Sequence, residues 1–292
     1  SATDGVLVNS PTFVVDNPPN YSNYAMHFDG TDDYVDCGDI AAMDGVATLT
    51  VSAWIKRDAA LSPVAIGKDL DTNNRLGINA YGDGRLYWLI CDGSSSWGSV
   101  ASNDTNWHHV ALVFDGGGTG NAGRLKGYLD GVEQTLTFNG TVPALTDDNS
   151  AEFKIGRDTS NNSYSDGSID EVAFWTTALT SAQINDIYNG GVPAALTSLS
   201  PIGWWRFGEN NAGTGTTITD QGSGSNDGTL SSTPTFSRSV PAEDATWNNR
   251  SLTFNGTDES MTTSADDTLA TKSYSFWAKS TKTTCNGVFD HG

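Results

Sequence analysis

Short segments with alternating apolar and polar residues run through most of the chain, and glycine, asparagine or aspartate bounds many of them. A period of two is typical of strands with one buried face. The clearest segment alternates Leu49, Val51, Ala53 and Ile55 with Thr50, Ser52, Trp54 and Lys56. Similar segments cover residues 24–28, 34–37, 64–67, 75–79, 85–90, 107–116, 125–129, 132–135 and 151–156. The pattern predicts an all-β, antiparallel protein.

Residues 167–175 predict one more strand, and a helix is expected directly after it. In the strand, Ile169, Glu171, Ala173 and Trp175 should lie on one face, with Asp170, Val172 and Phe174 on the other. Thr180 can cap a short helix near residues 181–189, and Asn189-Gly190-Gly191 would end it. Asp130-Gly131 predicts a tight hairpin turn.

The end of this region carries a family resemblance. Gly-x-Ile-Asp-Glu-Val at 167–172, Ala-Leu-Thr at 178–180 and the short helix resemble the closing signature of laminin-G-like domains, which belong to the concanavalin A-like lectin/glucanase superfamily. Trp-His-His-Val-Ala at 107–111 and Tyr-Leu-Asp-Gly at 128–131 add to it. The resemblance covers nearly all of residues 2–191 and recurs in 202–292. It implies a two-sheet antiparallel jelly-roll sandwich.

Four blocks recur in the same order, which indicates a duplicated domain. Residues 4–7, 10–13, 28–32 and 52–56 are matched by 227–230, 233–236, 254–258 and 275–279. We therefore expect residues 1–193 to form a laminin-G-like sandwich that lacks its opening strand. Residues 194–201 would be a linker, and 202–292 the first part of a second unit. Alternatively, Trp204–Phe207 supplies the missing opening strand of the first unit.

A truncated second unit would leave strand edges open. It would then be completed by sequence beyond this chain or by neighbouring copies in an oligomer or array.

Composition limits the possible partners. The chain has 292 residues, with 35 acidic against 15 basic side chains and a net charge of −20, which disfavours nucleic acid and anionic membranes. No apolar run approaches the roughly 20 residues of a membrane span, so no membrane insertion is expected. Cys37, Cys91 and Cys285 are scattered. They predict buried thiols, with a Cys37–Cys91 bridge as the alternative.

Catalysis by the closing strand is not expected. Glucanases of the superfamily that this chain resembles carry Glu-x-Asp-x-x-Glu on a strand that faces their cleft. Ser168 and Ala173 stand here in place of the two glutamates. A glycoside hydrolase would need carboxylates from elsewhere. His108 and His109 should point to opposite faces of a strand, so they cannot share one ion.

Sugar and calcium sites are the remaining candidates. Trp97, Tyr81 and Tyr164 lie in or beside polar turns, where exposed aromatic faces can stack on glycans; the alternative is that they cover a core edge. The family resemblance implies a calcium ion near a sandwich rim, for which Asp29 and Asp170 are candidate ligands. Alternatively, Asp29 caps its turn and Asp170 accepts backbone hydrogen bonds.

The expected function is a non-catalytic recognition or adhesion module. It would bind a glycan or a cell or particle surface, with calcium as a possible cofactor, at an extracellular, cell-surface or virion-surface location. The alternative is a structural building block of a virus particle or cell-surface fibre.

Overall fold

The structure, a computed structural model, describes residues 6–8, 12–14, 24–208, 213–237, 240–241, 251–253 and 260–262. The chain divides into two compact units. One is Asn17–Asn248, and the other combines Ser1–Asp16 with Asn249–Gly292. Each unit is described by itself below.

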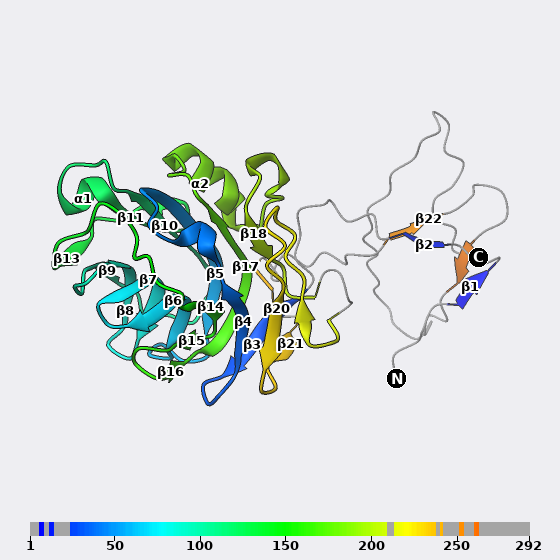
Figure 1. Cartoon of the computed structure of the whole chain (residues 1–292). Helices are drawn as coiled ribbons and strands as arrows, with labels where there is room; N and C mark the ends of the chain where they lie inside the picture. The colour runs from blue at the N-terminus through cyan, green and yellow to red at the C-terminus, as the bar shows by residue number, and fades with distance from the viewer. Residues whose placement is uncertain are drawn as a thin grey trace. The chain divides into compact units, whose positions relative to one another are not determined.

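The larger unit is a sandwich of two antiparallel sheets, as the alternating pattern predicts (Figure 1). The eight-stranded sheet has the order β12 (Val132–Glu133), β11 (Leu125–Leu129), β10 (His108–Asp115), β5 (Thr48–Arg57), β17 (Asp166–Trp175), β3 (Ala25–Asp29) and β21 (Thr235–Ser237), and β18 (Gly203–Trp205) also pairs with β17.

The nine-stranded sheet has the order β13 (Thr137–Asn139), β9 (Trp97–Ala101), β8 (Arg85–Cys91), β7 (Asn74–Tyr81), β6 (Val64–Asp71), β14 (Glu152–Ile155), β4 (Tyr34–Asp39), β20 (Gly228–Ser231) and β19 (Thr217–Ile218). A separate hairpin is formed by β15 (Arg157–Asp158) and β16 (Ser163–Tyr164). The described helical segments are η1 (Ala41–Met43), α1 (Gly120–Arg124), α2 (Ser181–Tyr188), η2 (Asn189–Gly191) and η3 (Thr197–Leu199).

Strand alternation places one set of side chains between the sheets and the other set outside. On β10, Val110, Leu112 and Phe114 enter the main core, whereas Ala111 and Val113 join a second apolar cluster with α2. Helix α2 thus covers the outer face of the eight-stranded sheet (Figure 1).

The predicted helix cap and hairpin turn are both confirmed. Thr180 and Gln183 form a reciprocal capping box at the start of α2, and Asn189 ends the helix in the left-handed conformation. Strands β11 and β12 pair across Asp130 and Gly131, which both have positive φ, as a tight turn with two such residues requires.

The predicted faces of β17 are wrong in one half of the strand. Ile169 enters the main core, but so do Val172 and Phe174, while Ala173 and Trp175 face α2. The register against β5 shifts between Asp170 and Ala173, and Glu171 has φ of 50°. This β-bulge inserts one residue and exchanges the two faces beyond it.

The unit boundaries differ from those expected from the sequence. Strands β18, β20 and β21 belong to the same sandwich as the preceding strands, because β18 pairs with β17, β20 with β4 and β21 with β3. Trp205 of β18 is fully buried, and its ring stacks on Phe153 at 5.5 Å and on Phe174 at 6.2 Å. The pairing of β18 with β17 agrees with the alternative that assigns Trp204–Phe207 to the first unit.

The smaller unit contains two strand pairs among its described residues. Strand β1 (Val6–Val8) pairs with β23 (Ser260–Thr262), and β2 (Thr12–Val14) pairs with β22 (Ser251–Thr253). The repeat blocks at 254–258 and 275–279, and Cys285, lie outside the described residues. Cys37 and Cys91 are buried free thiols, as predicted.

Candidate functional site

The outer face of the nine-stranded sheet carries polar and aromatic side chains in the centre of the sheet. On β7 and β8, the residues that point into the main core are Leu76, Ile78, Ala80, Leu86 and Trp88. Their neighbours in sequence point outward, and these include Arg75, Asn79, Tyr81, Arg85 and Tyr87. The alternation along β7 and β8 therefore places one set of side chains in the core and the other set on this outer face.

Three rings form a row across adjacent strands, which we call the aromatic row: Tyr81 on β7, Tyr87 on β8 and Trp97 on β9. The ring centroids of Tyr81 and Tyr87 lie 5.1 Å apart, and those of Tyr87 and Trp97 also lie 5.1 Å apart, edge to face. The strand register makes each pair diagonal neighbours on one face. All three side chains are half-buried, so the row keeps part of its surface accessible.

Charged groups lie along the aromatic row. The Tyr87 hydroxyl donates to Asp83, and burial followed by this hydrogen bond raises the pKa of Tyr87 to about 12. Arg85 donates from Nε and Nη2 to Ser99 Oγ at 3.1 and 2.9 Å. The row thus combines apolar ring faces with fixed hydrogen-bonding groups, which is the combination that sugar sites use.

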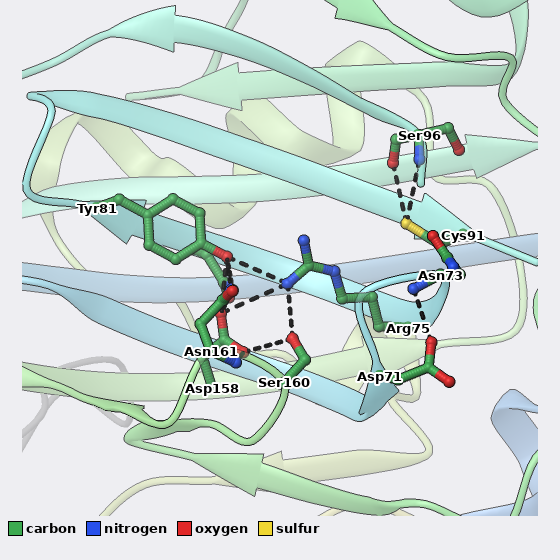
Figure 2. A network of polar contacts seen from close by, with 10 residues as sticks. Asp71, Asn73, Arg75, Tyr81, Cys91, Ser96, Asp158, Ser160 and Asn161 are labelled. Atoms are coloured by element: carbon green, nitrogen blue, oxygen red, sulfur yellow. Dashed lines mark hydrogen bonds and ion pairs between the residues drawn. The ribbon is translucent and has the colours of Figure 1, made fainter. Parts of the chain in front are cut away.

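A buried network fixes the Tyr81 end of the row (Figure 2). Tyr81 donates its hydroxyl to Asp158 Oδ2 at 2.7 Å, and the same carboxylate accepts from Asn79 at 2.9 Å and from Asn161 at 2.6 Å. Asp158 is 0% exposed. Burial alone would raise the pKa of Asp158, but hydrogen bonds from Tyr81, Asn161 and Ser160 outweigh it and hold that pKa below its usual value.

Asp69 lies close to the same network, but its pKa is shifted in the opposite direction to that of Asp158. Burial, and then the charge of Asp158, raises the pKa of Asp69 to about 8, against the opposing effect of Arg75. Arg75 itself donates to Ser160 at 2.8 Å and lies 3.5 Å from Asp158. At neutral pH the ionised Asp158 is thus balanced by Arg75, while Asp69 keeps its proton.

The structure brings together two of the three aromatic residues predicted from the sequence. Tyr81 and Trp97 belong to the aromatic row, but Tyr164 lies with Tyr34 of β4, and Arg157 sits 5.1 and 5.2 Å from their two ring centroids. Strand β4 is three strands away from β7, about 14 Å at ordinary strand spacing. Tyr87, the central ring, was missed, although the alternation of residues 85–90 places it on the polar side.

The two predicted metal ligands do not converge. Asp29 pairs with Asp166 at the start of β17, so Asp170 lies four residues further along that strand, about 13 Å away. Asp170 is fully buried and accepts from the backbone of Glu171 at 2.8 Å. Asp29 instead groups with Asp32 and Asp33, whose ligand oxygens all lie within 4.8 Å of one another.

The carboxylates of the closing strand have structural contacts. Glu171 is 3% exposed and accepts from Trp204 Nε1 at 2.6 Å and from Arg206 Nε at 2.8 Å. It therefore ties β18 to the bulge of β17. This arrangement does not present a pair of carboxylates across an open cleft, as glycoside hydrolysis requires.

His108 and His109 occupy different environments, as their positions in the sequence predict. His108 is hydrogen-bonded to Asp130 at 2.7 Å and to Asp104 at 2.9 Å, and the bond to Asp130 is the main cause of its raised pKa. His109 is fully buried beside Ser52, and burial lowers its pKa to about 4. They share no site.

No described helix is both long and apolar enough to span a bilayer.

Comparisons with known proteins agree with this architecture. Residues 29–185 match the model of the Laminin_G_3 family, described as the concanavalin A-like lectin/glucanases superfamily. No curated protein sequence matches the chain. Among solved structures, a protein from Bacteroides ovatus whose description proposes carbohydrate binding is similar, with a TM-score of 0.56 and 19% identity over 76% of this chain.

The chain spans 61% of the length of that Bacteroides protein. A heptameric SAP-like pentraxin from Limulus polyphemus has a TM-score of 0.41 and 19% identity, covering 57% of this chain and 82% of its own. Domains LG4-5 of the mouse laminin alpha1 chain have a TM-score of 0.40 and 16% identity, covering 60% and 48%. At 19% identity, the likeness to the Bacteroides protein shows the fold alone.

Proposed function

Since the chain belongs to the Laminin_G_3 family of the concanavalin A-like lectin/glucanases superfamily, we propose that it is a non-catalytic recognition module that binds a glycan at an exterior surface. The aromatic row is the observation that carries the proposal. Its rings stack on the apolar face of a sugar, while Arg85 and Asp83 offer hydrogen bonds to the hydroxyl groups. The buried network under Tyr81 holds that ring in place before a ligand arrives, which lowers the entropy cost of binding.

The test is retention on a panel of immobilised polysaccharides, followed by a reducing-end assay. We expect Trp97→Ala to weaken binding by up to about tenfold, because a stacked ring contributes on the order of 0.5–1.5 kcal/mol. Val132→Ala is the control, since Val132 is a 62% exposed apolar side chain on the other sheet. Equal binding by both variants would refute the role of the aromatic row, and new reducing ends would refute a non-catalytic function.

Calcium forms the second part of the proposal. The close grouping of Asp29, Asp32 and Asp33 favours a hard cation with oxygen ligands. Asp33 supports a cation site at this cluster. Burial disfavours its charged form and raises its pKa, although a hydrogen bond from the backbone N–H of Thr233 opposes this rise. A bound cation would stabilise the ionised carboxylate. Asp170 has no part in this site.

Melting temperature with calcium and with chelator tests the calcium site. Saturating calcium at about 100 times its Kd stabilises the folded state by about 2.7 kcal/mol, so the melting temperature should rise. Asp32→Asn should abolish the rise, whereas Asp148→Asn, which changes an acidic residue outside the cluster, should leave it unchanged. An equal calcium response in both variants would reject the site.

The same polysaccharide panel distinguishes the main proposal from the alternative of a structural building block. A protein that is retained on no polysaccharide, with or without calcium, would favour a role in a particle or fibre.

A further inference from the structure

Two cations and two tyrosine rings lie together near β4, away from the aromatic row. The guanidinium carbon of Arg157 lies over the rings of Tyr34 and Tyr164, 5.1 and 5.2 Å from their centroids, and these centroids are 6.5 Å apart. The Lys154 ammonium lies over the Tyr34 ring at 5.7 Å. Both cations are within the distance at which ring faces attract positive charge. We call these four residues the cation–ring cluster.

Arg157 has ring contacts but no polar partner. Its Nε is buried without a hydrogen bond, and among the described residues no hydrogen bond or ion pair joins its side chain to any other group. The other described arginines each donate to a side chain or a backbone carbonyl: Arg57, Arg75, Arg85, Arg124 and Arg206. A guanidinium has five N–H donors in one plane, and a carboxylate accepts from two of them at once. The unused donors therefore indicate an acceptor that this chain does not supply.

The charges around the cluster favour an anion as that acceptor. Lys154 donates to Glu152 at 2.5 Å, whereas Arg157 shares the Tyr34 ring with Lys154 and has no carboxylate of its own. The two like charges repel each other, and an anion beside Arg157 would replace this repulsion by attraction. The chain as a whole carries a net charge of −20, so an unpaired cation is unlike the rest of its surface.

The hairpin of β15 and β16 holds the cluster in place before a ligand arrives. Arg157 and Tyr164 are directly paired across it, so their side chains share one face. Asp158 is the next residue along β15, and its carboxylate is fixed by Tyr81 and Asn79 in the buried network. The hairpin is therefore anchored on one face while Arg157 lies on the other, and a preformed site lowers the entropy cost of binding.

We propose that the cation–ring cluster binds the carboxylate of an acidic sugar, such as a uronate, as a second subsite for the glycan; this inference rests on the proposed function. Arg157 donates two N–H groups to the carboxylate oxygens, and the half-buried rings of Tyr34 and Tyr164 contact the apolar face of the sugar. Strand β4 lies about 14 Å from β7. An oligosaccharide, rather than a single sugar, is therefore needed to contact both the cluster and the aromatic row.

Retention of the full chain on paired polymers tests the proposal. Immobilised polygalacturonate and hyaluronate are each compared with their methyl esters, which keep the sugars but lose the charge. Chelator is present throughout, so that calcium at the cluster of Asp29 does not contribute. We expect stronger retention on at least one acid form than on its ester. The net charge of −20 opposes non-specific attraction to a polyanion, so this preference would report a local site.

Three variants assign the preference to Arg157. Arg157→Gln should weaken binding of the acid form by about tenfold or more, because a bidentate, charge-assisted pair is lost. Arg157→Lys keeps the charge but not the planar fork, so it should restore only part of the binding. Lys126→Gln is the matched control. It removes the same charge from β11 of the other sheet and should bind as the wild type does.

The outcomes separate this inference from the proposed function. Equal retention on acid and ester forms, or wild-type binding of the acid forms by both Arg157 variants, would overturn the acidic-sugar subsite and leave the aromatic row untouched. Retention on no polysaccharide, acidic or neutral, would overturn the proposed function as well. Loss of the acid preference in Arg157→Gln, with binding of the esters and the melting temperature unchanged, supports the subsite.

Discussion

Replacing His109 by glutamine tests how burial on the outer face of the eight-stranded sheet couples stability to pH. The imidazole is fully buried, with Nε2 2.8 Å from Ser52 Oγ and its ring 5.5 Å from the Trp54 ring and 6.2 Å from the Tyr188 ring. Burial lowers the pKa of His109 from 6.5 to about 4, although the charge of Asp130 opposes this shift.

The sign and size of the effect follow from proton binding. Between pH 6.5 and 4 the unfolded chain takes up a proton at His109 that the folded chain does not, so stability falls as the pH falls through this range. The difference between 6.5 and about 4 corresponds to about 3 kcal/mol of unfolding free energy at 1.36 kcal/mol per pH unit. This contribution is present at pH 7 and lost by about pH 4.

Urea unfolding at several pH values, with NMR titration of the histidine rings, measures this contribution. Between pH 7 and pH 4 the wild type should lose about 3 kcal/mol more stability than His109→Gln. His108→Gln is the matched control with the opposite sign. The hydrogen bond to Asp130 raises the pKa of His108, so its contribution is present at low pH and lost as the pH rises through that raised pKa. Parallel pH profiles for the wild type and His109→Gln would refute the reasoning.

Three further predictions concern the sandwich. Trp205→Ala removes the fully buried ring between the aromatic side chains of β14 and β17, so it should lower the unfolding free energy by about 3–5 kcal/mol in urea titrations. Asp69→Asn should be more stable than the wild type at pH 9 but not at pH 4. The reason is that the folded wild type loses stability as the pH rises towards the raised pKa of Asp69, about 8. Thermal melts of both proteins at the two pH values check this. Thr180→Ala should cost about 1 kcal/mol by loss of the α2 cap, and Thr180→Ser should restore most of it.

Local patterns predicted most of the fold because they depend on neighbouring residues. The alternation of β5 and the cap at Thr180 are examples, since each depends on residues that lie only a few positions apart in the sequence. The bulge at Glu171 could not be predicted, because a non-glycine residue with positive φ is stabilised there by distant partners, Trp204 and Arg206. The pairing of β18 with β17 remained one of two alternatives for the same reason.

The aromatic row of the candidate site was predicted in part. The polar turns beside Tyr81 and Trp97 made these two residues candidates, but Tyr87 lies inside a strand, where the sequence alone does not show whether an outward ring is covered. Asp158 was missed because its role depends on a hairpin that brings it to Asn79 and Tyr81. Contacts between residues far apart in sequence thus account for what the sequence left open.

The strand that carries the family signature is poorly placed for recognition. Glu171 takes a left-handed backbone conformation, and its carboxylate is occupied by Trp204 and Arg206. The neighbouring Asp170 is fully buried. Glu171 therefore holds β17 and β18 together, and loss of Trp204 or Arg206 would leave this buried carboxylate without a partner. The outer side chains of β7, β8 and β9 include half-buried rings that the core does not enclose, so these residues can be substituted without loss of the fold.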